Sequence, residues 1–126
     1  MIAGGIDLGG TKIEASVFDA DWQPIDTRRI PTPPTYAALV FAMREQVMWL
    51  ESLKPNLPVG IGIPGLHDEA RGLAVTDNLA ANQMPFRSDI REAITRPVSF
   101  GNDCDLFAYS EALLGAGKGI KSVFGL

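Results

Sequence analysis

Hydrophobic and polar residues alternate along the first thirty residues in a pattern that predicts three β-strands. Apolar side chains occupy every second position of residues 2–8 and 12–18, and a Gly-Gly-Thr segment at 9–11 separates the two runs. Such alternation is typical of half-buried strands, and a glycine pair between two strands indicates a hairpin, because glycine reaches the positive φ of tight turns. A second turn at 19–21 precedes a third strand over 23–30. We therefore expect an antiparallel three-stranded meander.

The pattern changes to helical spacing after a proline-rich break at 31–34. A helix is predicted over about 35–53, with an apolar face formed by Tyr36, Leu39, Val40, Met43, Val47 and Leu50. The elements expected after it are a buried strand at 59–63, an irregular polar stretch at 66–86 with a short strand near 73–75, a helix at 87–95, a strand at 98–100, a helix at 103–114 and the first residues of a strand at 122–126. This order predicts an α/β fold, with a mixed sheet and flanking helices.

Composition and charge limit the classes of protein that fit. The chain has 126 residues, of which 46% are hydrophobic and 21% charged, and these values suit one globular domain with its own core. The net charge of −4 and the lack of a basic run argue against a nucleic-acid partner. The sequence opens without a secretory signal and has no apolar stretch near the ~18 residues of a membrane helix, so we expect no membrane partner and a cytoplasmic location. Cys104 is the only cysteine, which excludes an intrachain disulfide and a cysteine-rich zinc site within these residues.

The first candidate for chemistry is the segment from Asp7 to Lys12, at the predicted hairpin tip. Gly9 and Gly10 carry no side chains, so backbone N–H groups can approach an anion closely there, and Thr11 adds a hydroxyl donor. Asp7 ends the entering strand and could bind Mg²⁺ directly or through water. For the glycine pair alone, an ordinary tight turn is the simpler interpretation. The whole hexamer between two strands favours phosphate binding.

Two other glycine-rich nucleotide loops are excluded. A dinucleotide-binding fingerprint requires a turn from strand to helix, and here a second strand follows the glycines. The segment Gly117-Lys118-Gly119 fails the Walker A pattern, because Ala112 stands at the first glycine position and Gly119 at the Ser/Thr position. We expect that segment to be the end of a helix.

The second candidate is Asn102-Asp103, which follows the strand at 98–100 and opens the helix at 103–114. A carboxylate at a strand end, beside an amide that can hold a ligand hydroxyl, suits a general base for an alcohol. The alternative is that Asp103 caps the helix, since Asp is a common N-cap residue. Both roles are compatible, because capping needs only one carboxylate oxygen.

Other groups stay open at this point. The glycines of segment 60–65 would let a ligand ring pack on the backbone, but they suit a buried turn equally well. Asn78 and Asn82 offer amides suited to sugar hydroxyls, or simply belong to a solvated loop. His67 is the only histidine, which excludes a multi-histidine metal site, and we expect it in a surface loop. Cys104 is expected to be a packed small residue rather than a nucleophile.

The three motifs occur together and in one order, which is more informative than any one of them. They are Gly5-Ile6-Asp7-Leu8-Gly9-Gly10-Thr11-Lys12, Gly60-Ile61-Gly62-Ile63-Pro64-Gly65 and Gly101-Asn102-Asp103. Over essentially the whole chain this arrangement resembles the ROK family of sugar kinases and regulators, within the actin-like ATPase superfamily. The stretch from Asn102 to Ala112 is most similar to the N-acetylglucosamine kinase and glucokinase-like members.

The resemblance implies a ribonuclease H-like domain in an enzyme that phosphorylates a hexose or N-acetylhexosamine with ATP and Mg²⁺, usually at the C6 hydroxyl. It implies that the first phosphate motif comprises Asp7, Gly9, Gly10, Thr11 and Lys12, with Asp7 directed at the Mg²⁺ of ATP. It makes Asp103 the catalytic base. The residues implied for the sugar site are Gly65, Asn78, Asn82, Asn102 and Asp103.

The sequence also departs from the family pattern. Asp105 replaces the second amide of the usual Asn-Asp-Ala-Asn, and the loop from Asn78 to Asn82 differs from the usual Asn-Leu-Pro, so the sugar stays open. We interpret residues 1–119 as the N-terminal sugar- and phosphate-binding domain and 120–126 as the start of a C-terminal domain. The second phosphate motif and any structural Zn²⁺ site would belong to that C-terminal domain. We expect residues 1–126 alone to be inactive, and the resemblance allows a homodimer of the full-length protein.

Two alternatives accompany the kinase hypothesis. A sugar-sensing ROK-type transcriptional regulator would carry a DNA-binding segment before the first motif, and only six residues precede Asp7. A catalytically silent sugar-binding domain is the other alternative, and the presence of both Asp7 and Asp103 argues against it.

Overall fold

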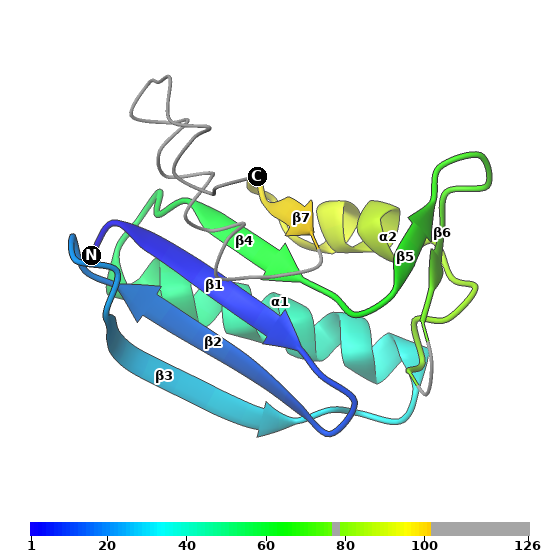
Figure 1. The fold of residues 1–126 in the computed structure, drawn as a ribbon, viewed down its shortest axis with the longest axis horizontal. Coiled ribbons are helices and arrows are strands. Elements are labelled where there is room, and N and C mark those ends of the chain that lie inside the picture. The colour runs from blue at the N-terminus through cyan, green and yellow to red at the C-terminus, as the bar shows by residue number, and fades with distance from the viewer. Residues whose placement is uncertain (77–78, 102–126) are drawn as a thin grey trace.

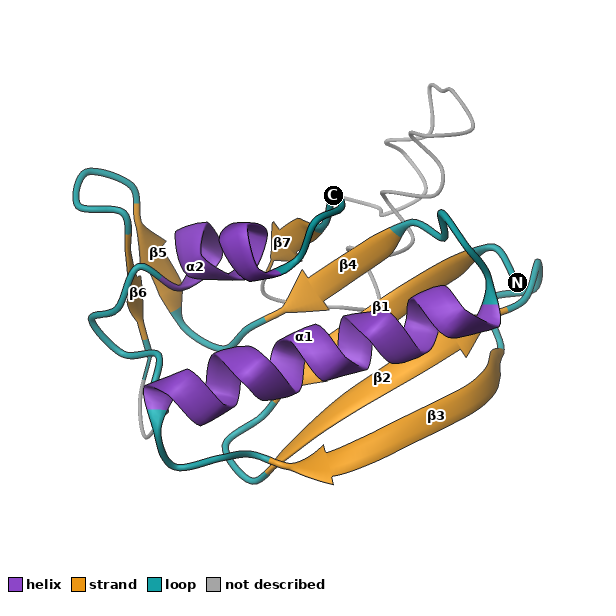
Figure 2. Cartoon of the chain, turned by 180° about the vertical axis from the view of Figure 1, so that it is seen from behind, coloured by secondary structure: helices purple, strands orange, loops and turns teal. Residues whose placement is uncertain are grey.

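The fold has two layers, a five-stranded sheet and a pair of helices that cover one of its faces (Figures 1 and 2). The structure is a computed structural model that describes residues 1–76 and 79–101. In chain order, the elements are β1 (Ala3–Leu8), β2 (Lys12–Phe18), β3 (Pro24–Pro31), α1 (Tyr36–Leu53), β4 (Val59–Gly62), β5 (Leu66–Asp68), β6 (Leu73–Val75), α2 (Phe86–Ala93) and β7 (Ser99–Gly101).

The main sheet has the order β3-β2-β1-β4-β7. Neighbours are antiparallel from β3 to β1, whereas β4 runs parallel to β1 and β7 runs parallel to β4. This arrangement confirms the predicted meander and the mixed sheet. The described part of the chain contains no helix long and apolar enough to cross a membrane.

The hairpin between β1 and β2 forms where it was predicted, but not for the predicted reason. Leu8 pairs with Ile13, and the N–H of Gly9 donates to the carbonyl of Lys12 at 2.9 Å. Neither Gly9 nor Gly10 has φ in the left-handed region. A Cβ on Gly9 would lie 3.0 Å from the Lys12 carbonyl oxygen, and close backbone approach therefore explains the glycine at position 9.

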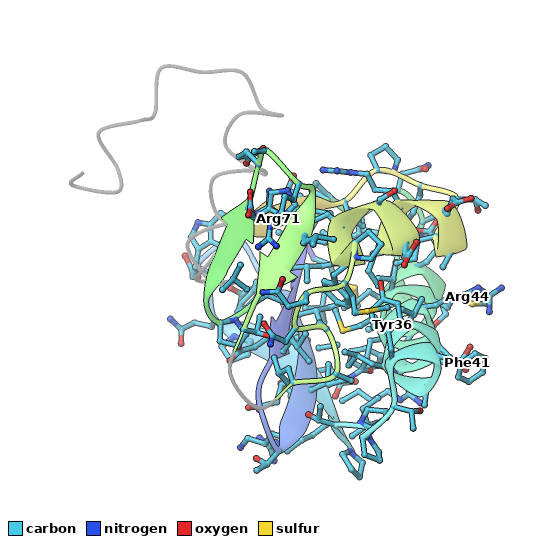
Figure 3. The ribbon with its side chains drawn as sticks, turned by 90° about the vertical axis from the view of Figure 1, so that its right-hand side faces the viewer. Tyr36, Phe41, Arg44 and Arg71 are labelled. Carbon is cyan, nitrogen blue, oxygen red and sulfur yellow. The ribbon has the colours of Figure 1, made fainter. Side chains whose placement is uncertain are left out.

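Helix α1 packs against β1 and β2 through a largely apolar face. Leu39, Met43 and Leu50 are fully buried, as the helical spacing predicted. The sequence pattern missed Gln46, which is also fully buried, because a polar residue breaks the apolar stripe. On the opposite side of the helix, Phe41 and Arg44 project away from the core (Figure 3).

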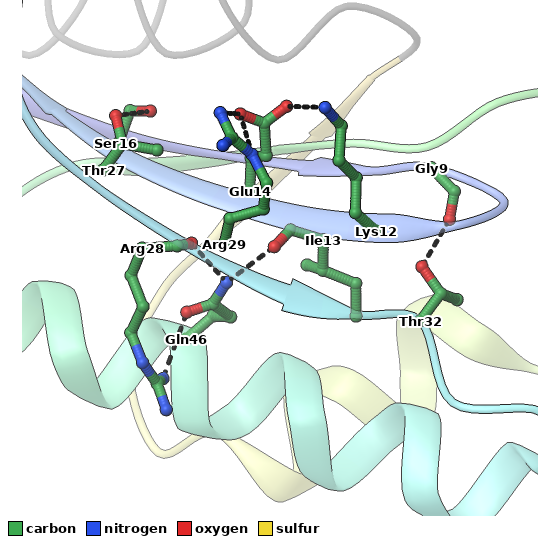
Figure 4. A network of polar contacts seen from close by, with 10 residues as sticks. All are labelled: Gly9, Lys12, Ile13, Glu14, Ser16, Thr27, Arg28, Arg29, Thr32 and Gln46. Carbon is green, nitrogen blue, oxygen red and sulfur yellow. Dashed lines mark hydrogen bonds and ion pairs between the residues drawn. The ribbon is translucent and has the colours of Figure 1, made fainter.

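Gln46 joins the helix to the second and third strands of the meander, β2 and β3. Its side-chain amide donates to the carbonyls of Ile13 at 3.0 Å and Arg28 at 2.9 Å, and it accepts a hydrogen bond from the Arg28 guanidinium at 3.1 Å (Figure 4). A buried amide is costly unless it is bonded in this way. The network therefore fixes how α1 sits on β2 and β3.

Two expectations for the middle of the chain were wrong. Residues 66–68 form β5, which pairs with β6 in a second, two-stranded sheet, where we expected irregular structure before residue 73. His67 lies in this strand, and only 12% of its side chain is exposed, so it is not a surface-loop residue. The strand is three residues long, and so short a run gives no detectable alternation.

Helix α2 begins one residue before the prediction and ends two residues before it. Tyr36 joins the starts of the two helices, since its hydroxyl donates to the Asp89 carboxylate at 2.6 Å. The helix predicted at 103–114 and the strand predicted at 122–126 lie outside the described residues.

Candidate functional site

Three parallel strands end side by side, and their carboxyl ends carry two of the predicted motifs and Gly101, the first residue of the third. Asp7 of β1 is in register with Gly62 of β4, which is in turn in register with Gly101 of β7. Two strand spacings of about 4.8 Å separate the outer members of this row, or about 10 Å in all. Ligands of open α/β sheets bind beyond the carboxyl ends of such strands. The Gly9–Thr11 turn and segment 63–65 both leave the sheet here, and Asn102 follows Gly101 directly in the sequence.

The hairpin tip, residues 9–11, is held from outside its own two strands by Thr32. The Thr32 hydroxyl donates to the Gly9 carbonyl at 2.7 Å (Figure 4). The Thr32 N–H donates to the Thr11 carbonyl at 3.0 Å. By contrast, a Cβ on Gly10 would meet no atom within 4 Å. The tip is therefore fixed on one side and open on the other.

A hollow of about 460 Å³ lies between this tip and the loop that follows β6. The tip contributes Gly10, the connection from β3 to α1 contributes Thr32, and the loop contributes Asn82. The other lining residues are Pro33, Pro34, Leu79 and Ala80. The structure thus brings two groups of predicted site residues, far apart in the sequence, to one concave surface.

Asn82, which lines this hollow, also helps to hold the loop after β6 in place. Its side-chain oxygen accepts a hydrogen bond from the Thr76 N–H at 3.0 Å. Next to it, the Gln83 N–H donates to the Ala74 carbonyl at 2.7 Å, and the Ala74 N–H donates to the Met84 carbonyl at 2.9 Å. These bonds hold the loop to β6 and fix the direction of the Asn82 amide.

Asp7 and Lys12 lie on the face of the sheet opposite the helices, because Ile6, Leu8 and Ile13 fill the core side. Lys12 forms an ion pair of 3.5 Å with Glu14, which is directly across the strand pair from Asp7.

Glu14 also accepts two hydrogen bonds from the Arg29 guanidinium, at 3.0 and 2.7 Å (Figure 4). Arg29 is the main reason that the pKa of the Glu14 carboxyl is lowered, and Lys12 adds to this effect. Glu14 therefore stays ionised and holds both cations beside the hairpin. Neither contact was anticipated from the sequence.

Gly65 has a conformation that explains its identity without a ligand. Its φ is +89°, and a Cβ would lie 2.1 Å from the carbonyl oxygen of Val75. No side chain is compatible with this approach of the turn before β5 to the end of β6. Of the two interpretations left open by the sequence, the structure supports the tight turn directly.

A second hollow, of about 220 Å³, lies between the C-terminal half of α1 and the segment after α2. Its charged groups are engaged in the protein, since Arg96 bonds both the Glu51 carboxylate, at 2.8 Å, and the Leu57 carbonyl. This hollow lies along the end of α1 that is remote from Thr32. It contains none of the predicted site residues.

Asn78, Asn102 and Asp103 lie outside the described residues. Within the described ranges, no three His, Cys, Asp or Glu side chains are grouped to hold a metal ion. The described part of the chain is thus an α/β domain in which the open hairpin tip and the Asn82 loop line one hollow, and this hollow is the candidate site.

Comparison with known proteins agrees with this description. The profile of the ROK family matches residues 3–126. An N-acetylgalactosamine kinase, AgaK, of Shewanella sp. (strain ANA-3) is 37% identical over 125 residues, which cover 97% of this chain and 40% of that protein. An N-acetyl-D-glucosamine kinase of Vibrio cholerae serotype O1 is 38% identical over 125 residues, which cover 97% of this chain and 41% of that protein. The crystal structure of a ROK family glucokinase from Streptomyces griseus, in complex with glucose and AMPPNP, matches with a TM-score of 0.69 and 30% identity, over 94% of this chain and 38% of that one.

The chain belongs to the ROK family. The family resemblance and the predicted fold class, an α/β domain of the actin-like ATPase type, are both confirmed. The chain spans about two fifths of the length of the curated relatives described above.

Proposed function

We propose that the full-length protein transfers the γ-phosphoryl group of ATP to a hexose or N-acetylhexosamine, with the C6 hydroxyl as the acceptor. The observation that carries this proposal is the convergence of the open hairpin tip and the Asn82 loop on one hollow at the ends of parallel strands. The relatives named above are kinases of N-acetylgalactosamine, N-acetylglucosamine and glucose, which supports the same class of substrate.

The residues present suit a phosphate group and a nucleotide-bound cation. Gly10 opens onto free space, so an anion has room beside the backbone there. Asp7 is an exposed residue near the end of β1, just before the hairpin tip. A single carboxylate is sufficient for Mg²⁺ that is otherwise held by phosphates and water. We assign Gly9, Gly10, Thr11 and Lys12 to phosphate binding and Asp7 to Mg²⁺. Bound ATP and Mg²⁺ would supply the transferable phosphoryl group and neutralise its charge.

The acceptor side is assigned to Asp103 as the base that takes the proton of the attacking hydroxyl, with Asn102 binding a neighbouring hydroxyl. Their place in the sequence supports this, because Gly101 ends β7 in register with Gly62 and Asp7. Asn78, Asn82 and Gly65 complete the proposed sugar site. Since Asn82 already accepts a bond from Thr76, its contribution to the sugar would be its amide N–H₂ group.

The proposal is tested by measuring ADP release from the full-length protein over a panel of hexoses and N-acetylhexosamines. Asp103→Asn should lower kcat by about 10²–10⁴-fold while sugar affinity is retained, because the amide keeps the shape but cannot accept the proton. A 6-deoxy sugar should bind competitively without being phosphorylated. Near-normal turnover of the Asp103→Asn variant would remove Asp103 from this role, and phosphorylation of the 6-deoxy sugar would exclude C6 as the acceptor.

A further inference from the structure

Thr32 lies outside every motif singled out in the sequence, yet it makes two bonds to the hairpin tip. Its hydroxyl donates to the Gly9 carbonyl at 2.7 Å, and its backbone N–H donates to the Thr11 carbonyl at 3.0 Å. These two carbonyls flank Gly10, the residue that opens into the hollow of about 460 Å³. Thr32 lines the same hollow.

The two bonds determine the direction of N–H groups as well as that of carbonyls. In a planar trans peptide the N–H points opposite to the C=O of the same unit. The carbonyl of Gly9 shares its peptide unit with the N–H of Gly10, and the carbonyl of Thr11 shares its unit with the N–H of Lys12. Because Thr32 holds both carbonyls toward itself, the N–H groups of Gly10 and Lys12 are held pointing away from Thr32.

The segment that carries Thr32 is itself stiff. Pro31 pairs with Lys12 in the sheet, and Pro33 and Pro34 follow Thr32 before α1 begins. Proline fixes φ and restricts the residue before it, so this connection has few alternative conformations. A donor held by a stiff segment can orient the tip at a small cost in conformational entropy.

We propose that Thr32 is a positioning residue, which orients the backbone N–H groups of the hairpin tip toward the phosphates of the nucleotide. This inference rests on the proposed function, and it assigns a task to a residue that would touch the tip rather than the reacting atoms. It predicts that Thr32 affects the use of ATP and leaves the use of the sugar unchanged.

The test compares Thr32→Val with Thr32→Ser in the full-length protein. Valine keeps the shape and the backbone N–H but removes the hydroxyl bond to Gly9, so the KM for ATP should rise about three- to tenfold, while the KM for the sugar stays constant. Serine keeps the hydroxyl and should restore the KM for ATP. The matched control is Thr27→Val, which removes a Thr hydroxyl from the exposed pair with Ser16, at 3.0 Å, and should change neither KM.

An unchanged KM for ATP in Thr32→Val, or an equal rise in both KM values, would overturn the inference. If Thr32→Val does not fold, as judged by circular dichroism, Thr32→Ser decides alone, since a raised KM for ATP in a variant that keeps the hydroxyl contradicts the proposal. Direct calorimetric titration with a non-hydrolysable ATP analogue separates this inference from the proposed function. Nucleotide binding that depends on Thr32, without sugar phosphorylation, would refute only the kinase assignment. If the unmodified protein binds no nucleotide, both the kinase assignment and the role of Thr32 are refuted.

Discussion

Gly10 gives the sharpest test of the phosphate site, because the structure separates its effect on binding from its effect on folding. A Cβ at this position would meet no protein atom within 4 Å, and φ is outside the left-handed region. Gly10→Ala should therefore fold normally, and the less flexible unfolded chain could even add about 0.4–1 kcal/mol of stability. Any loss of activity would then come from a clash between the new methyl group and a bound ligand, and not from a folding defect.

The expected loss follows from the contact that the new methyl group would obstruct. A hydrogen bond from a backbone N–H to a charged phosphate contributes about 1.5–3 kcal/mol. Loss of one such bond lowers kcat/KM for ATP by about 10- to 100-fold. The KM for the sugar should be unchanged, since the Gly10 backbone is assigned to the nucleotide.

The assay is initial-rate ADP release from the full-length protein, with ATP varied at saturating sugar and the sugar varied at saturating ATP. Gly72→Ala is the matched control, because a Cβ there also meets no atom within 4 Å, but the residue lies in the β5–β6 turn. With φ of +69°, alanine at position 72 should cost about 1–2 kcal/mol of stability and leave both KM values unchanged. A folded Gly10→Ala variant with a normal KM for ATP would show that no phosphate approaches the tip.

Three further predictions concern the fold that holds the site. Gly65→Ala should prevent stable folding of the β5–β6 hairpin, because its Cβ would lie 2.1 Å from the Val75 carbonyl oxygen, and proteolysis of this region should detect it. Gln46→Met should lower the free energy of unfolding by about 2–4 kcal/mol in urea titrations, since three hydrogen bonds of about 0.5–1.5 kcal/mol each are lost. Burial and the Asp89 carboxylate raise the pKa of Tyr36, so stability should be intact below the ordinary tyrosine pKa of about 10 and fall as the pH rises above it, and Tyr36→Phe should reduce this alkaline slope.

Each of these predictions has an outcome that contradicts it, and Gln46→Met has a matched control. Gln23→Met removes an amide from an exposed turn and should change stability by less than about 0.5 kcal/mol. A similar small effect for Gln46→Met would mean that its network does not stabilise the protein. Normal protease resistance of Gly65→Ala would show that the turn adapts, and an unaltered alkaline slope for Tyr36→Phe would exclude Tyr36 as its source.

The regular parts of the fold could be predicted because their patterns are long. The alternation over residues 2–8 and 12–18 and the helical stripe ending at Leu50 each extend over enough positions to reveal their period. Strand β5 was not predicted, since three residues carry no period, whereas the equally short β6 matches the short strand expected near 73–75. Gln46 was missed for a different reason, because its burial depends on three hydrogen bonds that a sequence pattern does not record.

In the candidate site, too, some residues could be predicted from the sequence and others could not. Gly10 and Asn82 could be singled out by residue type and context, and the structure places both at one hollow. Thr32 carried no recognisable signal, although its position at the end of a strand paired with the hairpin was a clue that it could reach the tip. For Gly65 the residue type was informative, but only its positive φ and its approach to Val75 in the structure distinguished a tight turn from a ligand contact.

The two edges of the main sheet have a consequence for behaviour at high concentration. Strand β3 forms one edge, mostly exposed, and it begins and ends with proline and carries Asp26, Arg28 and Arg29. Within the described residues β7 forms the other edge, and it is only three residues long. Prolines and charges on one edge and shortness on the other discourage pairing with a strand of a second molecule. The protein should therefore resist growth into β-aggregates by addition of strands to this sheet.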